Sequence, residues 1–186
     1  MSGIETLRPT ELVFVRHGES EANIVYQTAK ERGGGYSEEF RKKPNSEMEL
    51  TQRGIEQAMA AGKWIRKNIN GGVFAQYYVS SFKRAMHTAG YLQLPEAETK
   101  GVWKVRDYIR EQAYGYFDNL TTKEQKEKYP EIMARKDVDG VYWARLGGNQ
   151  WQILYSEQRL ELYKLCTVRF QEKTQLLWLT ETSSGL

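Results

Sequence analysis

The residues with the clearest chemical potential follow a short apolar run near the start of the chain. Leu12 to Val15 are four consecutive apolar residues, and Arg16, His17 and Gly18 come directly after them. Such a run predicts a buried strand, and ligands of open α/β sheets bind at the carboxyl ends of the strands. We therefore expect a core strand to present a cation, an imidazole and a glycine at one edge of a sheet.

Three other polar residues stand where a strand ends or a helix begins. Asn23 lies near the start of one predicted helix, Arg84 lies in the first turn of another, and Glu111 follows the third predicted strand. Arginine binds phosphate oxygens in a planar, bidentate arrangement, and helix N-termini attract anions. A neutral imidazole nitrogen such as that of His17 can attack phosphorus, and a carboxyl group can protonate the leaving oxygen. These residue types fit phosphoryl transfer through a phosphohistidine, with arginines supplying the positive charge and no metal required.

Each of these residues, taken alone, also fits a structural role. An isolated Arg-His-Gly after a strand is more often structural than catalytic, Arg84 alone fits a surface arginine, and Glu111 alone fits a solvated acid. His87, the second of only two histidines, fits a residue on a helix face outside the site. The order and spacing of the set, rather than any single member, favour the chemical interpretation.

The elements that must position these residues alternate between strands and helices. Thr51 is a good N-cap for a helix that Asn70-Gly71-Gly72 ends, and Ser80 or Ser81 can cap the next helix. The pattern predicts an α/β fold, a three-layer sandwich with a mostly parallel central sheet flanked by helices, in a single domain over residues 1–186 with an atypical C-terminal part. Strands are predicted at 11–16, 76–81, 102–109 and 174–179, and helices at 51–69, 82–94 and 156–171, with a capping box at Thr121–Glu124 that begins another.

Helical spacing predicts which side chains of two helices face the core. The first predicted helix has its apolar positions on one face, and the second has a smaller set. These positions are Ile55, Ala58, Met59, Gly62, Ile65 and Ile69 in the first helix and Ala85, Ala89 and Leu92 in the second.

The polar segment 26–47 stands out from the rest of the N-terminal half. It contains Gly33-Gly34-Gly35 and the basic run Arg41-Lys42-Lys43-Pro44. These glycines and charges predict a mobile excursion from the core, and such loops often cover sites or select substrates. We expect substrate identity to depend on this segment and on residues 112–148.

Composition excludes several classes of function. The net charge is +3, with 27 basic and 24 acidic residues interspersed, so no basic stripe for nucleic acid is expected. The single cysteine, Cys166, cannot form an internal disulfide and fits a core position in a cytoplasmic protein. We expect no signal peptide, no membrane span and no zinc site made by protein ligands alone.

The sequence resembles the histidine phosphatase superfamily, in its phosphoglycerate mutase-like branch. The resemblance implies that His17 is the phosphorylated nucleophile, that Arg16, Asn23 and Arg84 bind phosphate, and that Glu111 is the acid and base. It also implies a small phosphorylated substrate and no cofactor. The similar blocks are residues 16–23, 50–58, 80–89 and 109–115.

The sequence departs from this family at two places in its C-terminal part. The family's second pocket histidine, in a His-Gly pair after the last core strand, has no counterpart, and Gln175–Thr182 stands at that place. The family's Gly-Glu-Ser block is replaced by Gly147-Gly148-Asn149. One reading frame shifted by two bases could encode both missing motifs, so we hypothesise frame errors in this region. The codons for residues 145–186 decide this, because the hypothesis fails if no shifted frame yields His-Gly.

Three functions remain open at this point. A phosphomonoester hydrolase is favoured over a mutase because Glu21-Ala22-Asn23 stands where mutases of the family usually have a Trp-Asn pattern. A catalytically impaired, phosphate-binding member is the third possibility, because the second histidine is absent.

Overall fold

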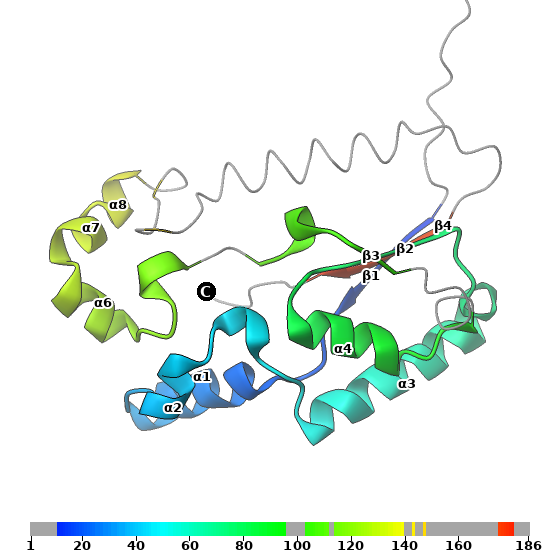
Figure 1. Ribbon diagram of the computed structural model, residues 1–186, viewed down its shortest axis with the longest axis horizontal. Coiled ribbons are helices and arrows are strands. Elements are labelled where there is room, and N and C mark those ends of the chain that lie inside the picture. The colour runs from blue at the N-terminus through cyan, green and yellow to red at the C-terminus, as the bar shows by residue number, and fades with distance from the viewer. Residues whose placement is uncertain are drawn as a thin grey trace, which may run out of the picture.

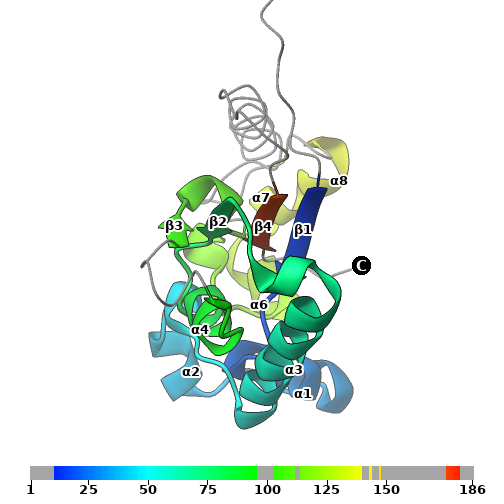
Figure 2. The same ribbon diagram turned by 90° about the vertical axis from the view of Figure 1, so that its right-hand side faces the viewer.

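A parallel β-sheet forms the centre of the computed structural model, which describes residues 11–95, 103–111, 114–139, 143, 147 and 175–180. Its strands are β1 (Glu11–Arg16), β2 (Gln76–Val79), β3 (Trp103–Val105) and β4 (Gln175–Thr180). The order across the sheet is β1-β4-β2-β3, and every pair is parallel (Figure 2). The predicted α/β class with a parallel sheet is therefore confirmed.

Two helices cover one face of this sheet, and the remaining helices lie toward the carboxyl ends of its strands (Figure 1). The covering helices are α3 (Gln52–Asn68) and α4 (Lys83–Tyr91). The other helices are α1 (Glu21–Arg32), α2 (Glu38–Lys42), α6 (Thr122–Lys128), α7 (Pro130–Ala134) and α8 (Lys136–Asp139). Short 3₁₀ turns occur at Asn45–Glu47, Asn70–Gly72, Asp107–Ile109 and Gly115–Phe117. No helix among the described residues is both long and apolar enough to cross a bilayer.

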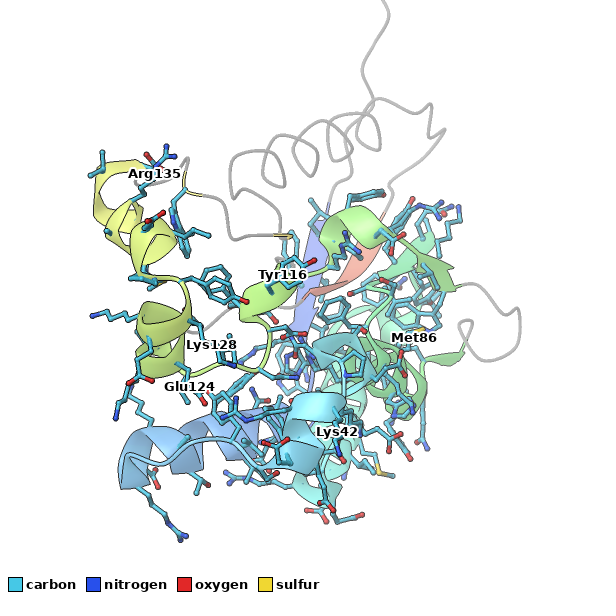
Figure 3. The ribbon with its side chains drawn as sticks, turned by 60° about the vertical axis from the view of Figure 1, so that its left-hand side comes forward. Lys42, Met86, Tyr116, Glu124, Lys128 and Arg135 are labelled. Carbon is cyan, nitrogen blue, oxygen red and sulfur yellow. The ribbon has the colours of Figure 1, made fainter. Side chains whose placement is uncertain are left out.

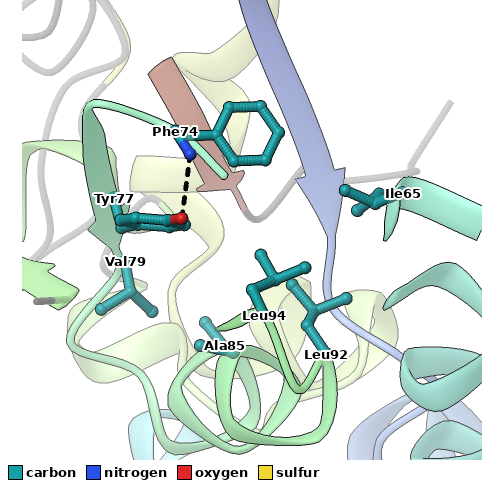
Figure 4. Close-up of a cluster of buried hydrophobic side chains, with 8 residues drawn as sticks. Ile65, Phe74, Tyr77, Val79, Ala85, Leu92 and Leu94 are labelled. Atoms are coloured by element: carbon teal, nitrogen blue, oxygen red, sulfur yellow. Dashed lines mark hydrogen bonds between the residues drawn. The ribbon is translucent and has the colours of Figure 1, made fainter. Parts of the chain in front are cut away.

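The main core lies between the sheet and helices α3 and α4 (Figure 4). Tyr77 is 1% exposed, and its hydroxyl accepts from the Phe74 amide at 2.9 Å and donates to the Gly72 carbonyl at 3.2 Å. The buried phenol is thus satisfied, as an interior polar group must be. The other buried members are Ile65, Val79, Ala85, Ala89, Leu92 and Leu94. The predicted core face of α4 is therefore confirmed.

Helices α3 and α4 approach each other through a glycine. A Cβ built on Gly62 would lie 2.0 Å from the carbonyl oxygen of Leu92, so no side chain fits at this position. A Cβ built on Gly90, on α4, would meet no atom within 4 Å. The helix contact therefore depends on the missing side chain at Gly62.

Several predicted boundaries and contacts were wrong in detail. The third strand covers only Trp103–Val105 rather than 102–109, because a 3₁₀ turn follows it. The N-cap of α4 is Phe82 rather than Ser80 or Ser81, although the Ser80 hydroxyl accepts from the Phe82 amide at 3.3 Å. Met59 is 44% exposed instead of lying in the core. The predicted helix 156–171 and Cys166 lie outside the described residues.

The segment 26–47 is not the loop excursion that its polar sequence predicts. It contains the end of α1, helix α2 and a 3₁₀ turn, and Phe40 and Met48 are buried in a small cluster with Ala22. Arg41 also forms an ion pair with Glu124 of α6, and Figure 3 shows Glu124 on the side of α6 toward α1 and α2. Phe40, packed with Tyr26 and Tyr36 of the same segment, attaches this charged segment to Ala22 and Met48 outside it.

The glycine at the α3–α4 contact gives a test of the packing. Gly62→Ala should lower the free energy of unfolding by roughly 1–3 kcal/mol, because the added methyl group overlaps a main-chain carbonyl. Gly90→Ala is the matched control and should raise stability by about 0.5–1 kcal/mol, since its site is open and alanine favours helix. Urea unfolding measures both, and equal stabilities of the two variants would contradict this packing.

Candidate functional site

The main chain of the loop that carries His17 is held by contacts with two helices. The Gly18 amide donates to the hydroxyl of Thr88 on α4 at 3.1 Å. The Thr51 amide, at the start of α3, donates to the carbonyl of Glu19 at 2.9 Å. A Cβ on Gly18 would lie 2.2 Å from the carbonyl oxygen of Gly54, and a Cβ on Gly54 would lie 2.0 Å from that of Glu19. The loop and the first turn of α3 therefore touch backbone to backbone.

His17 lies at the end of β1 with 8% of its surface exposed. Its Nδ1 lies 2.7 Å from the carbonyl oxygen of Gly18. A carbonyl only accepts, so Nδ1 carries the proton and Nε2 of the neutral ring carries the lone pair. Burial, opposed by the Gly18 hydrogen bond and helped by the charges of Arg84 and Arg16, lowers the pKa of His17 to about 4. The imidazole is therefore neutral at pH 7, with the lone pair of Nε2 available.

Asn23 is held at the N-terminus of α1 by a capping box with Ser20. The Ser20 amide donates to Oδ1 of Asn23 at 2.9 Å, and the Asn23 amide donates to the Ser20 hydroxyl at 3.4 Å. These bonds fix the orientation of the Asn23 side chain. Because Oδ1 serves as an acceptor, the side-chain NH₂ is the group that can donate to a bound anion.

Arg84, on α4, is 2% exposed and has partners from separate segments. Its guanidinium donates to the Asn45 carbonyl at 2.6 Å and to the Asn45 side-chain oxygen at 3.0 Å. It also forms an ion pair with Glu111 at 2.8 Å and lies over the ring of Phe82 at 4.8 Å. A charge buried to this extent must be paired, and these contacts fulfil that requirement.

Asp118 is a further carboxylate beside this pair that sequence reasoning missed. Its Oδ2 accepts from the Asn45 amide at 3.3 Å. Burial raises the pKa of Asp118, while hydrogen bonds from the backbone of Asn45 and Asn119 and the charge of Arg84 act in the opposite direction. Only its place after a Gly-Tyr-Phe turn marked it, and that signal does not distinguish it from an ordinary turn residue.

The structure brings the predicted site residues together in two groups. A cavity of about 430 Å³ is lined by Arg16, His17 and Asn23. Arg84 and Glu111 are joined to each other and do not line that cavity, although the charge of Arg84 reaches His17. The sequence also missed Asn45 as a partner of Arg84.

Two further positions bear on the site. His87 lies on α4 and does not line the cavity, as its helix-face interpretation expects. Thr180 ends β4 and pairs in register with Arg16, so the last core strand reaches the same sheet edge as His17. Within the described part of the chain, no group of three or more His, Cys, Asp or Glu residues could hold a metal ion.

The protonation of His17 can be measured directly. In an NMR titration of the imidazole signals, His17 should titrate near pH 4 rather than near its ordinary pKa of 6.5. The unfolded chain binds this proton more readily, so stability should fall as the pH drops from 6.5 toward 4, by up to about 1.4 kcal/mol per unit. His17→Gln assigns the signal by its loss. A midpoint near 6.5 would contradict the buried, neutral imidazole.

The chain is similar to curated phosphoglycerate mutases over two thirds of its length. It is 31% identical over 126 residues to a 2,3-bisphosphoglycerate-dependent phosphoglycerate mutase of Neisseria meningitidis serogroup C, covering 67% of this chain and 48% of that protein. It is 32% identical over 131 residues to the enzyme of the same name from Treponema denticola, covering 67% of this chain and 44% of that protein. The chain thus spans about half the length of the curated relatives it matches.

Solved structures share its fold. A putative alpha-ribazole-5'-P phosphatase from Escherichia coli superposes with a TM-score of 0.65 at 24% identity, over 93% of this chain and 74% of that one. A mycobacterial glucosyl-3-phosphoglycerate phosphatase superposes with a TM-score of 0.63 at 21% identity, over 91% and 75%.

A family model places these similarities in one group. The model matches residues 12–160, which include the loop of His17, the buried Arg84 and the Glu111 carboxylate. The chain belongs to the histidine phosphatase superfamily (branch 1).

Proposed function

We propose that this chain hydrolyses phosphomonoesters through a phosphohistidine formed at Nε2 of His17. The observation that carries the proposal is the state of this imidazole. It is buried and neutral, its Nδ1 proton is committed to the Gly18 carbonyl, and it lines a cavity together with Arg16 and Asn23. A neutral nitrogen beside an arginine and an amide suits attack on a phosphoryl group.

In the first step, Nε2 of His17 attacks phosphorus and the bond from phosphorus to the ester oxygen breaks. Arg16 and the Asn23 amide group donate to the oxygens of the transferring group, which carry its charge. Glu111 gives a proton to the departing oxygen, so the alcohol leaves neutral. The N–P bond that forms replaces the P–O bond that is lost, and Nδ1 stays bonded to Gly18 as positive charge develops on the ring.

In the second step, water attacks the phosphohistidine. The Glu111 carboxylate left by the first step takes a proton from this water, and the N–P bond breaks to release inorganic phosphate. Glu111 is held through Oε2 by Arg84, and Oε1, which accepts from the Tyr114 hydroxyl at 3.5 Å, is the oxygen that would carry the proton. Arg84 contributes positive charge to the site in both steps, since its field already acts on His17.

Transfer to a second substrate is the alternative suggested by the curated relatives, which are named as phosphoglycerate mutases. Such a mutase would pass the phosphoryl group from His17 to another hydroxyl rather than to water. Names of structural neighbours point instead to phosphatases. Hydrolysis is favoured here because Glu21-Ala22-Asn23 stands where mutases of the family usually have a Trp-Asn pattern, and of these three residues only Asn23 lines the cavity of His17.

The missing second histidine favours slow turnover. His17 and His87 are the only histidines of the chain, so no imidazole can take the second position. Removing one preorganised donor to a developing charge typically lowers a rate by about 10²–10³. A member that binds phosphate compounds without turning over is therefore the second candidate function.

Covalent labelling separates these functions. With a ³²P-labelled aryl phosphate, the chain should acquire an acid-labile, alkali-stable label and release inorganic phosphate. His17→Gln should remove the label and lower hydrolysis by about a thousandfold or more, because the nucleophile is lost. His87→Gln is the matched control, since it changes the other histidine.

The outcomes have distinct meanings. Hydrolysis that survives His17→Gln would overturn the assignment of the nucleophile. A label that passes to added phosphoglycerate faster than to water would favour the mutase. Binding of inorganic phosphate without label or turnover would favour the phosphate-binding member.

A further inference from the structure

A second, larger cavity adjoins the one that contains His17. It has a volume of about 680 Å³, compared with about 430 Å³ for the cavity of His17. Tyr26 and Lys30, both on α1, line both cavities. The two cavities therefore share part of their lining along this helix, which gives a molecule bound at His17 a path from one toward the other.

The spacing along α1 gives this path a direction. Asn23, Tyr26, Gln27 and Lys30 stand at helical intervals of three, four and seven residues, which place them on one face. Asn23 is at the end beside His17, and Lys30 is at the end beside the larger cavity. At 1.5 Å per residue, the path from Asn23 to Lys30 is about 10 Å long. This is longer than a phosphate group alone requires.

The wall of the larger cavity combines open backbone with aromatic side chains. A Cβ on Gly33 or Gly34 would meet no atom within 4 Å, so the glycine run leaves space beside it. The rings of Tyr26 and Tyr36, which both line the cavity, have centroids 5.5 Å apart. Aromatic side chains of this kind stack against flat or ring-shaped ligands.

The polar groups on the opposite wall come from α6. Thr122 and Lys123 line the cavity there, and Lys30 adds a positive charge where the two cavities join. The carboxylate of Glu124 is already paired with Arg41 and accepts from the Thr121 hydroxyl at 2.7 Å. Glu127 also lines the cavity, and its carboxylate lies 3.9 Å from Nζ of Lys123. Each carboxylate is thus paired with a cation, and the lining suits hydroxyl-rich, neutral or anionic groups rather than cations.

We propose that this larger cavity binds the alcohol portion of the substrate, and that the substrates are phosphomonoesters of bulky, ring-bearing polar alcohols. Sugars and nucleosides share this chemistry. The proposal rests on the function proposed for His17. A cavity of this size accommodates a drug-sized ligand, and a three-carbon phosphate would leave most of it to water. The ring would stack on Tyr26 and Tyr36, and its hydroxyls would meet Thr122 and Lys30.

Three phosphate esters of increasing size test this subsite. We expect kcat/KM of the chain for adenosine 5′-monophosphate and ribose 5-phosphate to exceed that for glycerol 3-phosphate by about tenfold or more. A larger advantage for adenosine 5′-monophosphate would assign the stacked ring to the base, and an equal one would assign it to the sugar. Both results support the subsite.

A cavity-filling variant gives the decisive comparison. Gly34→Leu adds a side chain where the backbone leaves room and has no positive φ, so it should fold and occupy the cavity. The ratio of kcat/KM for adenosine 5′-monophosphate to that for glycerol 3-phosphate should fall about tenfold. Gly90→Leu is the matched control, because Gly90 is equally open but lies on α4, and it should leave this ratio unchanged.

Calorimetry keeps the subsite testable without turnover. The chain should bind adenosine 5′-monophosphate about tenfold more tightly than inorganic phosphate, and Gly34→Leu should remove that advantage. Equal kcat/KM for all three esters, with a ratio that Gly34→Leu leaves unchanged, would overturn the subsite while hydrolysis through His17 stands. If no ester is hydrolysed, the proposed function fails by itself, and binding of the nucleotide no tighter than phosphate would then overturn the subsite.

Discussion

Burial of the Arg84 guanidinium constrains the arrangement of the whole site. A cation with 2% exposure is tolerated only where neighbouring groups replace the water it has lost. Asn45 supplies two oxygens from the 3₁₀ turn after α2, and Glu111 supplies a carboxylate from the chain beyond β3. Three separate segments must therefore converge before α4 can pack with this charge inside. The same convergence places a positive charge close to His17 and contributes to keeping its imidazole neutral.

Much of the fold could be predicted from the sequence because its patterns are local. The apolar run before Arg16 gave β1 directly, and the N-cap at Thr51 gave the start of α3. The segment 26–47 could not be predicted in the same way. Its order comes from Phe40, which contacts Ala22 and Met48 only in the folded structure. A charged, glycine-rich sequence shows the solvent-facing side of such a segment and conceals the few residues that attach it.

The site shows a similar division. Types and order of residues identified His17, Asn23, Arg84 and Glu111 as candidates, and the structure places His17 with Asn23 and Arg84 with Glu111. The contributions of Asn45 and Thr88 were missed because they act through a main-chain carbonyl and a single hydroxyl. Such contacts leave no signature in sequence. The backbone of Thr180 also reaches the sheet edge of His17, since strand position depends on apolar patterning and not on the residue that ends the strand.

The direct contact of Gly18 with Gly54 separates two parts of the molecule that can evolve at different rates. Because the loop that carries His17 rests on main-chain atoms of α3, no side chain can be added at this contact without moving the loop. The cavity walls formed by the C-terminal half of α1, by α6 and by the glycines after α1 are not part of this backbone contact. Substitutions there can change the shape of the cavities while the position of the His17 imidazole stays the same. The absence of side chains at Gly18 and Gly54 thus lets the same loop be combined with different cavity walls.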